Sequence, residues 1–440
     1  MKKYTIVTYG CQMNVHESEK IAGQVEKLGY EKCNDENNSD LVIFNTCCIR
    51  ETAEQKAMGN IGALKQVKKR NKNMIIVVCG CMSQQKDYDK LIKEKFPFVD
   101  IVIGTANLHK IGSLIFDYEN KRKKIYEIDY SEKPEIVEAD TICRTSYPHA
   151  WVNITYGCNN FCTYCIVPYV RGRERSRNYE EILKDIRDLL SQGYKEITLL
   201  GQNVNSYGSD LTNGVNFAFL LKEIAKIDQK FRLRFMTSHP KDLSSEVVDI
   251  IASSPNMCKC IHLPCQAGST RVLGLMNRRY TKEHYLSLVE MIRKKIPNCA
   301  ITSDIMVGFP TETEEDFLDT LDLVKKCRFS GAFTFIYSKR KGTIAEKMEQ
   351  IPYKIKQERV ERLIKLQNQI TAELSNEYVG KTYEVLIDGK NDKRNGVVIG
   401  RTDCGKLVNV KGDESLIGKF VNVYIKSAKL SALEGEIIAE

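Results

Sequence analysis

The chain has 440 residues, of which 42% are hydrophobic and 28% are charged, as in an ordinary globular protein of about two to four domains. No apolar run approaches the ~20 residues that cross a membrane. Sixteen cysteines without an export signal indicate a reducing cytoplasm, in which thiols stay available for metal binding. The net charge of +9 suits a polyanionic partner such as RNA, and it suits plain solubility equally well.

Residues 1–117 alternate strand-like and helical patterns, which predicts a Rossmann-like parallel sheet with helices on its faces. The basic and then apolar start resembles an export signal, but its apolar stretch is short and we interpret it as the first strand. The strand-like runs are Tyr4–Thr8, Leu41–Phe44, Met74–Val78 and Val99–Ile103. Residues 118–143 are charged and poorly periodic, so we expect a linker there.

Three cysteines of this first domain follow its strand-like runs: Cys11 the first, Cys47 the second and Cys81 the third. Because the carboxyl ends of parallel strands share one edge of a sheet, we expect the three thiols to converge and to bind an iron–sulfur cluster. The alternative for any single one is a buried cysteine that packs as a small apolar residue. Cys48 and Cys79 lie close by in the sequence and are possible substitute ligands.

Residues 144–375 contain six more strand-like runs between helical or loop segments, which predicts an α/β fold of the incomplete (β/α)6 barrel type. The runs are Val152–Tyr156, Ile197–Leu200, Leu233–Met236, Cys260–Leu263, Ile301–Met306 and Ala332–Tyr337. Residues 352–374 have the pattern of an amphipathic helix with Ile364 on its apolar stripe. Short runs between Gly, Asn and Asp turns predict a small all-β barrel over residues 376–440.

The segment CNNFCTYC places Cys158, Cys162 and Cys165 within eight residues. A closed four-iron cluster takes four protein ligands, so three thiolates leave one iron open for a small molecule. The alternatives are a zinc site and a disulfide. A structural zinc site needs four ligands, usually as two separated pairs, and a disulfide needs an oxidising compartment. The spacing therefore favours an iron–sulfur cluster with an open iron.

Polar side chains follow several of the barrel strands, where the active site of such a barrel lies. The candidates for contacts to a small molecule or substrate are Gln202, Asn203, Ser238, His239, Ser303, Asp304, Tyr337 and Arg340. Four arginines that alternate after the cysteine motif are candidates for phosphate pairing or base stacking: Arg171, Arg173, Arg175 and Arg177. The alternative for each of these residues is a solvated polar side chain without a role.

These motifs resemble those of the methylthiotransferases of the radical S-adenosylmethionine (SAM) superfamily, over essentially the whole chain. The resemblance is carried by TYGCQMN (8–14), NTCCIRE (45–51), ITYGCNNFCTYC (154–165), LLGQNVNSYG (199–208) and DIMVGFPTET (304–313). It implies a methylthiotransferase amino-terminal domain, a radical SAM core and a carboxyl-terminal TRAM domain. The first motif resembles the branch that acts on tRNA carrying an isopentenylated adenosine.

The resemblance also implies two [4Fe–4S] clusters and SAM as cofactors. One cluster, on Cys158, Cys162 and Cys165, would bind SAM, and the other, on Cys11, Cys47 and Cys81, would present sulfur to C2 of the adenine. Further contacts to the cofactor are expected from Tyr164, Gln202, Asn203 and Ser303, and contacts to RNA from Arg171, Arg173, Arg175, Arg177 and Arg340. The expected partners are tRNA, an electron donor such as flavodoxin or ferredoxin, and a source of sulfur, for a cytoplasmic monomer.

Two alternatives stay open. A sister methylthiotransferase would act on threonylcarbamoyl-adenosine in tRNA or on an aspartate of a ribosomal protein, and the form of the first motif argues against both by resemblance. A protein of another class would be a non-catalytic iron–sulfur RNA-binding protein or electron carrier. A carrier normally closes its cluster with four cysteines, so the motif with three disfavours it.

Overall fold

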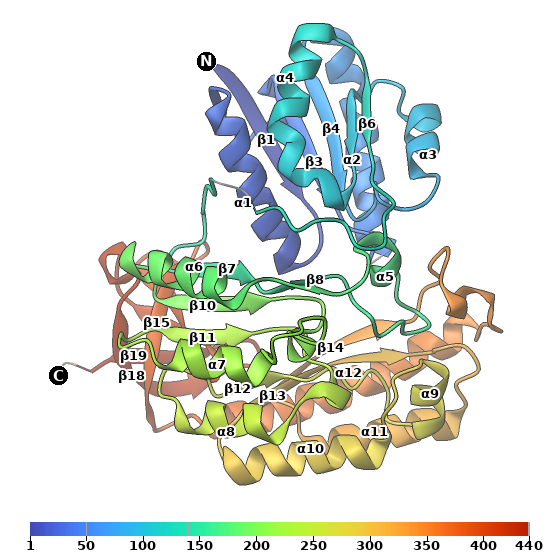
Figure 1. Cartoon of the computed structure of the whole chain (residues 1–440). Coiled ribbons are helices and arrows are strands. Elements are labelled where there is room, and N and C mark those ends of the chain that lie inside the picture. Colours follow the sequence, from blue (N-terminus) through green and yellow to red (C-terminus); the bar gives the residue numbers. More distant parts are fainter. Residues whose placement is uncertain (50, 139–140, 439–440) are drawn as a thin grey trace. The chain divides into compact units, whose positions relative to one another are not determined.

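The computed structural model describes residues 1–49, 51–138 and 141–438, and its chain divides into two compact units (Figure 1). The N-terminal unit contains residues 1–145, 156–161 and 165–175. The C-terminal unit contains residues 146–155, 162–164 and the chain from Ser176 onward.

The N-terminal unit is built on a parallel sheet with the strand order β2-β1-β3-β4-β5-β6. The strands are β1 (Lys2–Thr8), β2 (Tyr30–Lys32), β3 (Leu41–Thr46), β4 (Ile75–Gly80), β5 (Ile101–Ile103) and β6 (Ile125–Glu127). In the register of the sheet, Ile43 of β3 lies between Ile6 of β1 and Val77 of β4. The carboxyl ends of β1, β3 and β4 therefore lie next to one another along one edge.

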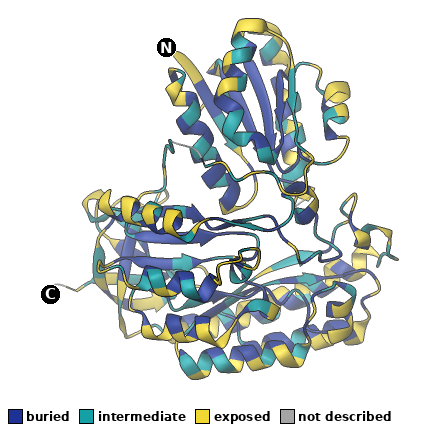
Figure 2. Ribbon diagram, in the orientation of Figure 1, coloured by how far each residue is buried: buried dark blue, intermediate teal, exposed yellow. Residues whose placement is uncertain are grey.

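Helices cover both faces of this sheet, as Figure 2 shows by the burial of its strands. They are α1 (Gln12–Lys27), α2 (Glu51–Arg70), α3 (Tyr88–Lys95) and α4 (Ile111–Lys121). α1 and α4 pack on one face, where Ile21 meets Ile43, and α2 and α3 pack on the other, where Ile61 meets Phe44. Successive side chains of β3 point to opposite faces, so both faces need apolar residues. The predicted parallel sheet with helices on its faces is confirmed.

The two edge strands have no counterpart among the strand-like runs of the sequence. β6 lies within residues 118–143, where we expect a linker, and it pairs in parallel with β5. α4 also continues to Lys121 inside that span. β2 and β6 have three residues each, and β2 exposes Glu31 and Lys32. Strands this short at an edge carry no apolar alternation that would mark them in a sequence.

The C-terminal unit begins with six strands that all run parallel. They are β7 (His149–Asn153), β10 (Glu196–Leu200), β11 (Arg232–Phe235), β12 (Cys260–His262), β13 (Ala300–Val307) and β14 (Gly331–Ile336). They form two sheets, β11-β10-β7 and β12-β13-β14, and a parallel bridge between Leu233 and Met257 links β11 to the chain just before β12. This is the predicted incomplete (β/α)6 barrel. Two-residue strands β8 (Thr155–Tyr156) and β9 (Arg175–Ser176) accompany it.

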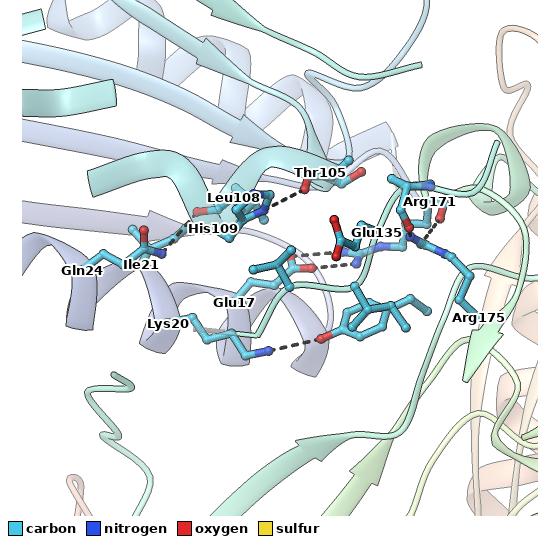
Figure 3. A pocket seen from close by; sticks show the side chains of 15 residues that line it. Glu17, Lys20, Ile21, Gln24, Thr105, Leu108, His109, Glu135, Arg171 and Arg175 are labelled. Atoms are coloured by element: carbon cyan, nitrogen blue, oxygen red, sulfur yellow. Dashed lines mark hydrogen bonds and ion pairs between the residues drawn. The ribbon is translucent and has the colours of Figure 1, made fainter. Parts of the chain in front are cut away.

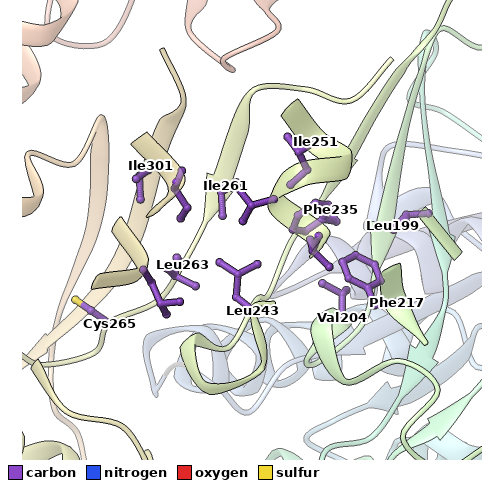
Figure 4. Packing of buried hydrophobic residues seen from close by; sticks show 14 of the residues in the cluster. Leu199, Val204, Phe217, Phe235, Leu243, Ile251, Ile261, Leu263, Cys265 and Ile301 are labelled. Carbon is purple, nitrogen blue, oxygen red and sulfur yellow. The ribbon is translucent and has the colours of Figure 1, made fainter. Parts of the chain in front are cut away.

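Helices follow the barrel strands and close its outer surface. They are α6 (Tyr179–Ser191), α7 (Phe217–Ala225), α8 (Ser245–Ser253), α9 (Thr270–Leu275), α10 (Lys282–Lys295) and α11 (Glu314–Cys327). Figure 4 shows the core between strands and helices, where Leu199, Phe235 and Ile261 of three strands lie near Phe217 and Ile251 of two helices. Among the described residues, no helix has the length and apolar content that crossing a membrane requires.

The long helix α12 (Tyr353–Asn376) follows the barrel, close to the predicted range of 352–374. Most of the predicted apolar stripe is buried, including Leu363, Gln367 and Ile370, whereas Ile364 is 40% exposed. Arg359 is also buried, and its guanidinium is paired with the buried Glu312 carboxylate at 2.8 Å. A charge that has such a partner can be buried, so polarity alone does not reveal Arg359 as part of the buried face.

Residues 382–437 close a barrel of five strands in the order β15-β16-β17-β19-β18, as the sequence predicts. The strands are β15 (Thr382–Lys390), β16 (Val397–Thr402), β17 (Leu407–Lys411), β18 (Phe420–Ala428) and β19 (Leu433–Ile437). Small branched residues such as Val385, Val408 and Val423 fill its interior. Closure leaves no free sheet edge in the described part of this small domain.

The small barrel is fastened to β11 by two arginines of the same unit. Arg232 donates to the backbone carbonyls of Glu384 and Arg401, and Arg234 donates to those of Thr402 and Asp403. Since the acceptors are main-chain groups, the attachment depends on the path of β15 and β16 and on the loop that follows β16.

We predict that His149 makes the stability of the C-terminal unit depend on pH. Burial alone would lower the pKa of His149, but hydrogen bonds to Asp388 and Glu196, at 3.3 and 3.2 Å, raise it from 6.5 to about 9. The protonated histidine therefore stabilises the fold fully below pH ~6.5, and this contribution is lost as the pH rises through ~9. Urea unfolding between pH ~6 and ~9 should show a smaller decline in His149→Gln than in the unmodified protein. Equal declines would contradict the prediction.

Candidate functional site

The thiols of Cys11, Cys47 and Cys81, here called the N-terminal thiols, lie at one edge of the first sheet. Each residue follows the carboxyl end of a strand, β1, β3 or β4. Gly10 has a φ of +105°, and a Cβ atom built on it would lie 2.7 Å from the Cys47 sulfur. The Cys81 N–H donates to the Thr46 carbonyl at 3.0 Å. The structure therefore places the three cysteines next to one another along this edge, and a side chain at position 10 would collide with Cys47.

Two more cysteines lie near this set, and the sheet separates them. Cys48 is buried and hydrogen-bonds to Cys81, and this bond lowers the pKa of the Cys81 thiol to about 7 although burial acts in the opposite direction. Cys79 belongs to the apolar cluster on the α1/α4 face, whereas Cys47, Cys48 and Cys81 belong to the cluster on the α2/α3 face. Cys48 is therefore within reach of the set, and Cys79 is not.

An all-thiol set of this kind suits iron–sulfur chemistry, because soft thiolates select such clusters. Burial and the neighbouring Cys81 raise the pKa of Cys47 to about 12, so the free protein holds it as a thiol. Among the described residues, no three His, Cys, Asp or Glu side chains are grouped so that they could hold one metal ion between them.

The segment with Cys158, Cys162 and Cys165, here called the cysteine loop, is held at both ends. The Cys158 N–H donates to the Gly172 carbonyl at 3.1 Å. Gly157 precedes it with a φ of +74°, and a Cβ there would lie 2.1 Å from the carbonyl oxygen of Arg173. After Cys165, helix α5 (Val167–Val170) buries Val170 in the apolar cluster of the N-terminal unit.

A buried arginine faces one cysteine of the loop. Arg278 is 5% exposed, and its guanidinium donates to the Cys162 sulfur at 3.5 Å and to the Pro264 carbonyl at 3.0 Å. Burial opposes the charged form, but Tyr280, Tyr164 and Cys162 raise the pKa of Arg278 above its usual value.

Four polar atoms at the carboxyl ends of β10 and β11 are buried and lack a hydrogen-bond partner within the described residues. They are Asn203 Oδ1, Asn205 Nδ2, Ser238 Oγ and His239 Nε2. The residues themselves are tied together, because Asn205 Oδ1 accepts from the His239 N–H at 3.1 Å and Asn203 Nδ2 donates to Asp242 at 2.7 Å. Buried polar groups without partners are costly, so their concentration at one end of the barrel indicates a ligand site.

His239 is the best defined of these groups. Its Nδ1 accepts from the Lys241 N–H at 3.3 Å, which assigns the ring proton to Nε2. Burial, together with Arg278, Lys241 and Arg279, lowers the pKa of His239 to about 2. The imidazole is therefore neutral, and its Nε2–H is a buried donor that has no acceptor among the described residues.

The other predicted cofactor contacts lie in different settings. Tyr164 packs edge-on against Phe309 with 6.5 Å between ring centroids. Gln202 follows β10 and is partly buried. Ser303 is fully buried, and its hydroxyl donates to the Leu263 carbonyl at 3.0 Å and accepts from the Cys265 N–H at 3.0 Å, so it joins β13 to the segment after β12.

The arginines predicted to contact RNA fall into two groups. Arg171 is 7% exposed and pairs with Glu17, and Arg177 is 5% exposed and donates to the Asn153 carbonyl and to Asp185. The remaining three are at least partly exposed: Arg173, Arg175 and Arg340. Arg173 lies over the ring of Phe161, with 4.4 Å to the centroid.

Sequence reasoning misses the side chains that support the cysteines. Asn14 and Glu17 lie on the first turns of α1 and accept hydrogen bonds from Arg171. Asn14 belongs to the motif TYGCQMN, but the motif does not predict this contact. Arg278 lies more than a hundred residues from Cys162, and no local pattern connects the two.

Comparisons with known proteins agree with this architecture. Residues 3–104 match the uncharacterized protein family UPF0004, residues 152–324 match the radical SAM superfamily, and residues 376–438 match the TRAM domain. A solved radical S-adenosylmethionine methyltransferase, TsrM from Kitasatospora setae, is similar in fold, with a TM-score of 0.58 and 12% identity over 79% of this chain and 74% of that one. The fold and the cysteine loop define a radical SAM enzyme.

Much closer relatives specify the family. A protein of Thermoanaerobacter pseudethanolicus is 51% identical over 99% of this chain and 92% of its own length, and one of Clostridium botulinum (strain Langeland) is 52% identical over 99% and 97%. Both are named tRNA-2-methylthio-N(6)-dimethylallyladenosine synthase. The chain belongs to this family, whose cofactors are SAM and [4Fe–4S] clusters.

We predict that Cys48, but not Cys79, can replace Cys47 as a cluster ligand, because only Cys48 lies on the same face of the sheet. Cys79→Ala should keep the iron content of the unmodified protein. Cys47→Ala should keep part of the iron of the second cluster, and Cys47→Ala combined with Cys48→Ala should lose about 4 irons per chain. Anaerobic iron and sulfide analysis measures each case. Loss of iron in Cys79→Ala would contradict the assignment of faces.

Proposed function

We propose that this protein methylthiolates C2 of N6-isopentenyl-adenosine next to the anticodon of tRNA. The observation that carries the proposal is the presence of two separate sets of three cysteines, each at the carboxyl edge of its own parallel sheet or barrel, in a chain that is about half identical to synthases of that name. One set alone is enough for a radical SAM enzyme. The second set gives sulfur a place to be held before transfer.

The cysteine loop and the N-terminal thiols each have the donors that a [4Fe–4S] cluster needs. When bound, the clusters and SAM supply the radical that takes hydrogen from C2 and the methylated sulfur that then bonds to this carbon. The chain's own residues hold the reactants: Asn203, Asn205, Ser238 and His239 offer hydrogen bonds at the barrel edge, and Arg278 supplies positive charge beside Cys162. Fixing the reacting groups in a site that excludes water is the protein's main contribution.

Binding of tRNA is supported by charge and by the small barrel. Arg173, Arg175 and Arg340 are the predicted arginines that stay partly accessible for phosphates or bases. The closed barrel over residues 382–437 matches the TRAM domain, and small barrels of this kind bind single-stranded nucleic acid. Arg171 and Arg177 are buried, so we do not assign them to the RNA surface.

The reaction needs further partners, which we propose from its chemistry. Reducing a cluster to start each turnover calls for a one-electron donor such as flavodoxin or ferredoxin, and each product consumes a sulfur atom from a separate source. We propose that the enzyme acts as a monomer in the reducing cytoplasm, where free thiols and tRNA are both available.

Iron content and product analysis test the proposal together. The anaerobically reconstituted protein should hold ~8 irons per chain, and the variant with Cys158, Cys162 and Cys165 changed to Ala should hold ~4. Mass spectrometry of nucleosides from treated tRNA should show the methylthio group on isopentenylated adenosine, and on neither threonylcarbamoyl-adenosine nor a ribosomal protein. A protein with only ~4 irons, all lost in the variant, would contradict a second cluster.

We predict that His239 contacts a reactant through its Nε2–H. His239→Phe removes an unpartnered buried donor but also the acceptor of the Lys241 N–H, so its two effects on the free energy of unfolding oppose each other, while it lowers turnover about tenfold or more. His239→Gln, which keeps a donor near the same position, should retain more activity. SAM cleavage without RNA separates the two contacts: it falls in His239→Phe if SAM is the acceptor and is unchanged if the adenosine of tRNA is. Full turnover in His239→Phe would contradict both.

A further inference from the structure

Arg171 lies among buried groups next to the N-terminal thiols. Its guanidinium donates to both carboxylate oxygens of Glu17, at 2.6 and 3.1 Å, and Figure 3 shows the two side chains facing each other. It also donates to Asn14 Oδ1 at 3.2 Å. The same Asn14 oxygen accepts from the Cys11 thiol at 3.6 Å. One amide oxygen therefore separates Arg171 from Cys11.

The guanidinium also lies near a second cysteine of the set, Cys81, on which its positive charge acts. Burying a guanidinium is unfavourable unless opposite charges surround it. Glu17 is one such charge, and it is itself 6% exposed on α1. The thiols of Cys11 and Cys81 are the other groups near the guanidinium, so the arginine lies between the Glu17 carboxylate and the N-terminal thiols.

We propose that Arg171 is a positioning residue for the cluster held by Cys11, Cys47 and Cys81, which it supports with positive charge and hydrogen bonds while Glu17 fixes its orientation. The inference rests on the proposed function, which assigns these cysteines as ligands. Arg171 follows the cysteine loop by six residues, and α5 between them is anchored by Val170 in the core of the N-terminal unit. The segment that follows the cysteine loop thus supplies Arg171 to the surroundings of the N-terminal thiols.

The sign of the electrostatic effect follows from the charge of the cluster. Reduction adds one electron and breaks no bond, so a nearby buried cation stabilises the reduced form and raises the reduction potential. Arg171→Gln removes the cation and should lower the midpoint potential of the second cluster. Glu17→Gln removes the opposing anion and should raise it. A purely structural role for the pair predicts loss of iron without such opposite shifts.

The experiment isolates the second cluster in the full chain by changing Cys158, Cys162 and Cys165 to Ala. In this background, anaerobic titration followed by electron paramagnetic resonance gives the midpoint potential, and iron analysis gives occupancy. We expect a downward shift in Arg171→Gln, an upward shift in Glu17→Gln, and a smaller shift in Arg171→Lys, which keeps the charge but loses the two-pronged hydrogen bond to Glu17. If Arg171→Gln does not fold, the midpoint potentials of Glu17→Gln and Arg171→Lys test the proposal.

Arg173→Gln is the matched control, because this arginine is two residues away and its side chain is 40% exposed. It should weaken tRNA binding and leave potential and iron content unchanged. The opposite pattern for Arg171, a potential shift at unchanged tRNA affinity, supports the inference. Unchanged potentials in all Arg171 and Glu17 variants would overturn it, and so would reduced tRNA affinity alone. Absence of iron from the background variant itself would instead refute the proposed function.

Discussion

Parallel strands deliver their carboxyl ends to a common edge, and both units of this chain place their reactive groups there. In the first sheet the edge collects thiols after β1, β3 and β4, and in the barrel it collects amides, a hydroxyl and an imidazole after β10 and β11. Residues that are tens of positions apart in sequence become neighbours because the strand order makes them so. The chemistry of each site is then decided by which side chains stand at those ends.

Each cysteine set is accompanied by a buried arginine that comes from another part of the chain. Arg171 approaches Cys11 and Cys81, and Arg278 approaches Cys162. Both guanidinium groups are almost inaccessible to water, where a charge interacts far more strongly with its neighbours than at the surface. A cluster held by thiolates becomes more negative when a donor reduces it, so a fixed cation beside each set would offset part of that charge. These arginines differ from Arg173, whose exposed position leaves it available to solvent or RNA.

The sequence was sufficient for the parts of the structure that repeat a simple pattern. Buried parallel strands give continuous apolar runs, and the cysteines at their ends could be placed on one edge of the sheet from the sequence alone. The edge strands β2 and β6 were not predictable, because a strand of three residues is too short to show a period. Arg171 shows a second limit: alternation with three other arginines suggests a charged surface, whereas the fold buries this one against Glu17. Burial of a charge depends on a distant partner, and local composition does not reveal it. Arg359 on α12 is buried for the same reason, through its pair with Glu312.

The small barrel is joined to β11 partly through Arg232 and Arg234, which donate to carbonyl oxygens of its main chain. Every amino acid supplies that carbonyl, so most side chains of β15, β16 and the loop beyond can change without loss of these hydrogen bonds. Asp388, which pairs with His149, and Glu384, which pairs with Arg232, are exceptions, because their side chains belong to the joint. The rest of the surface of this module is therefore free to diverge under selection for different RNA shapes while these contacts stay constant.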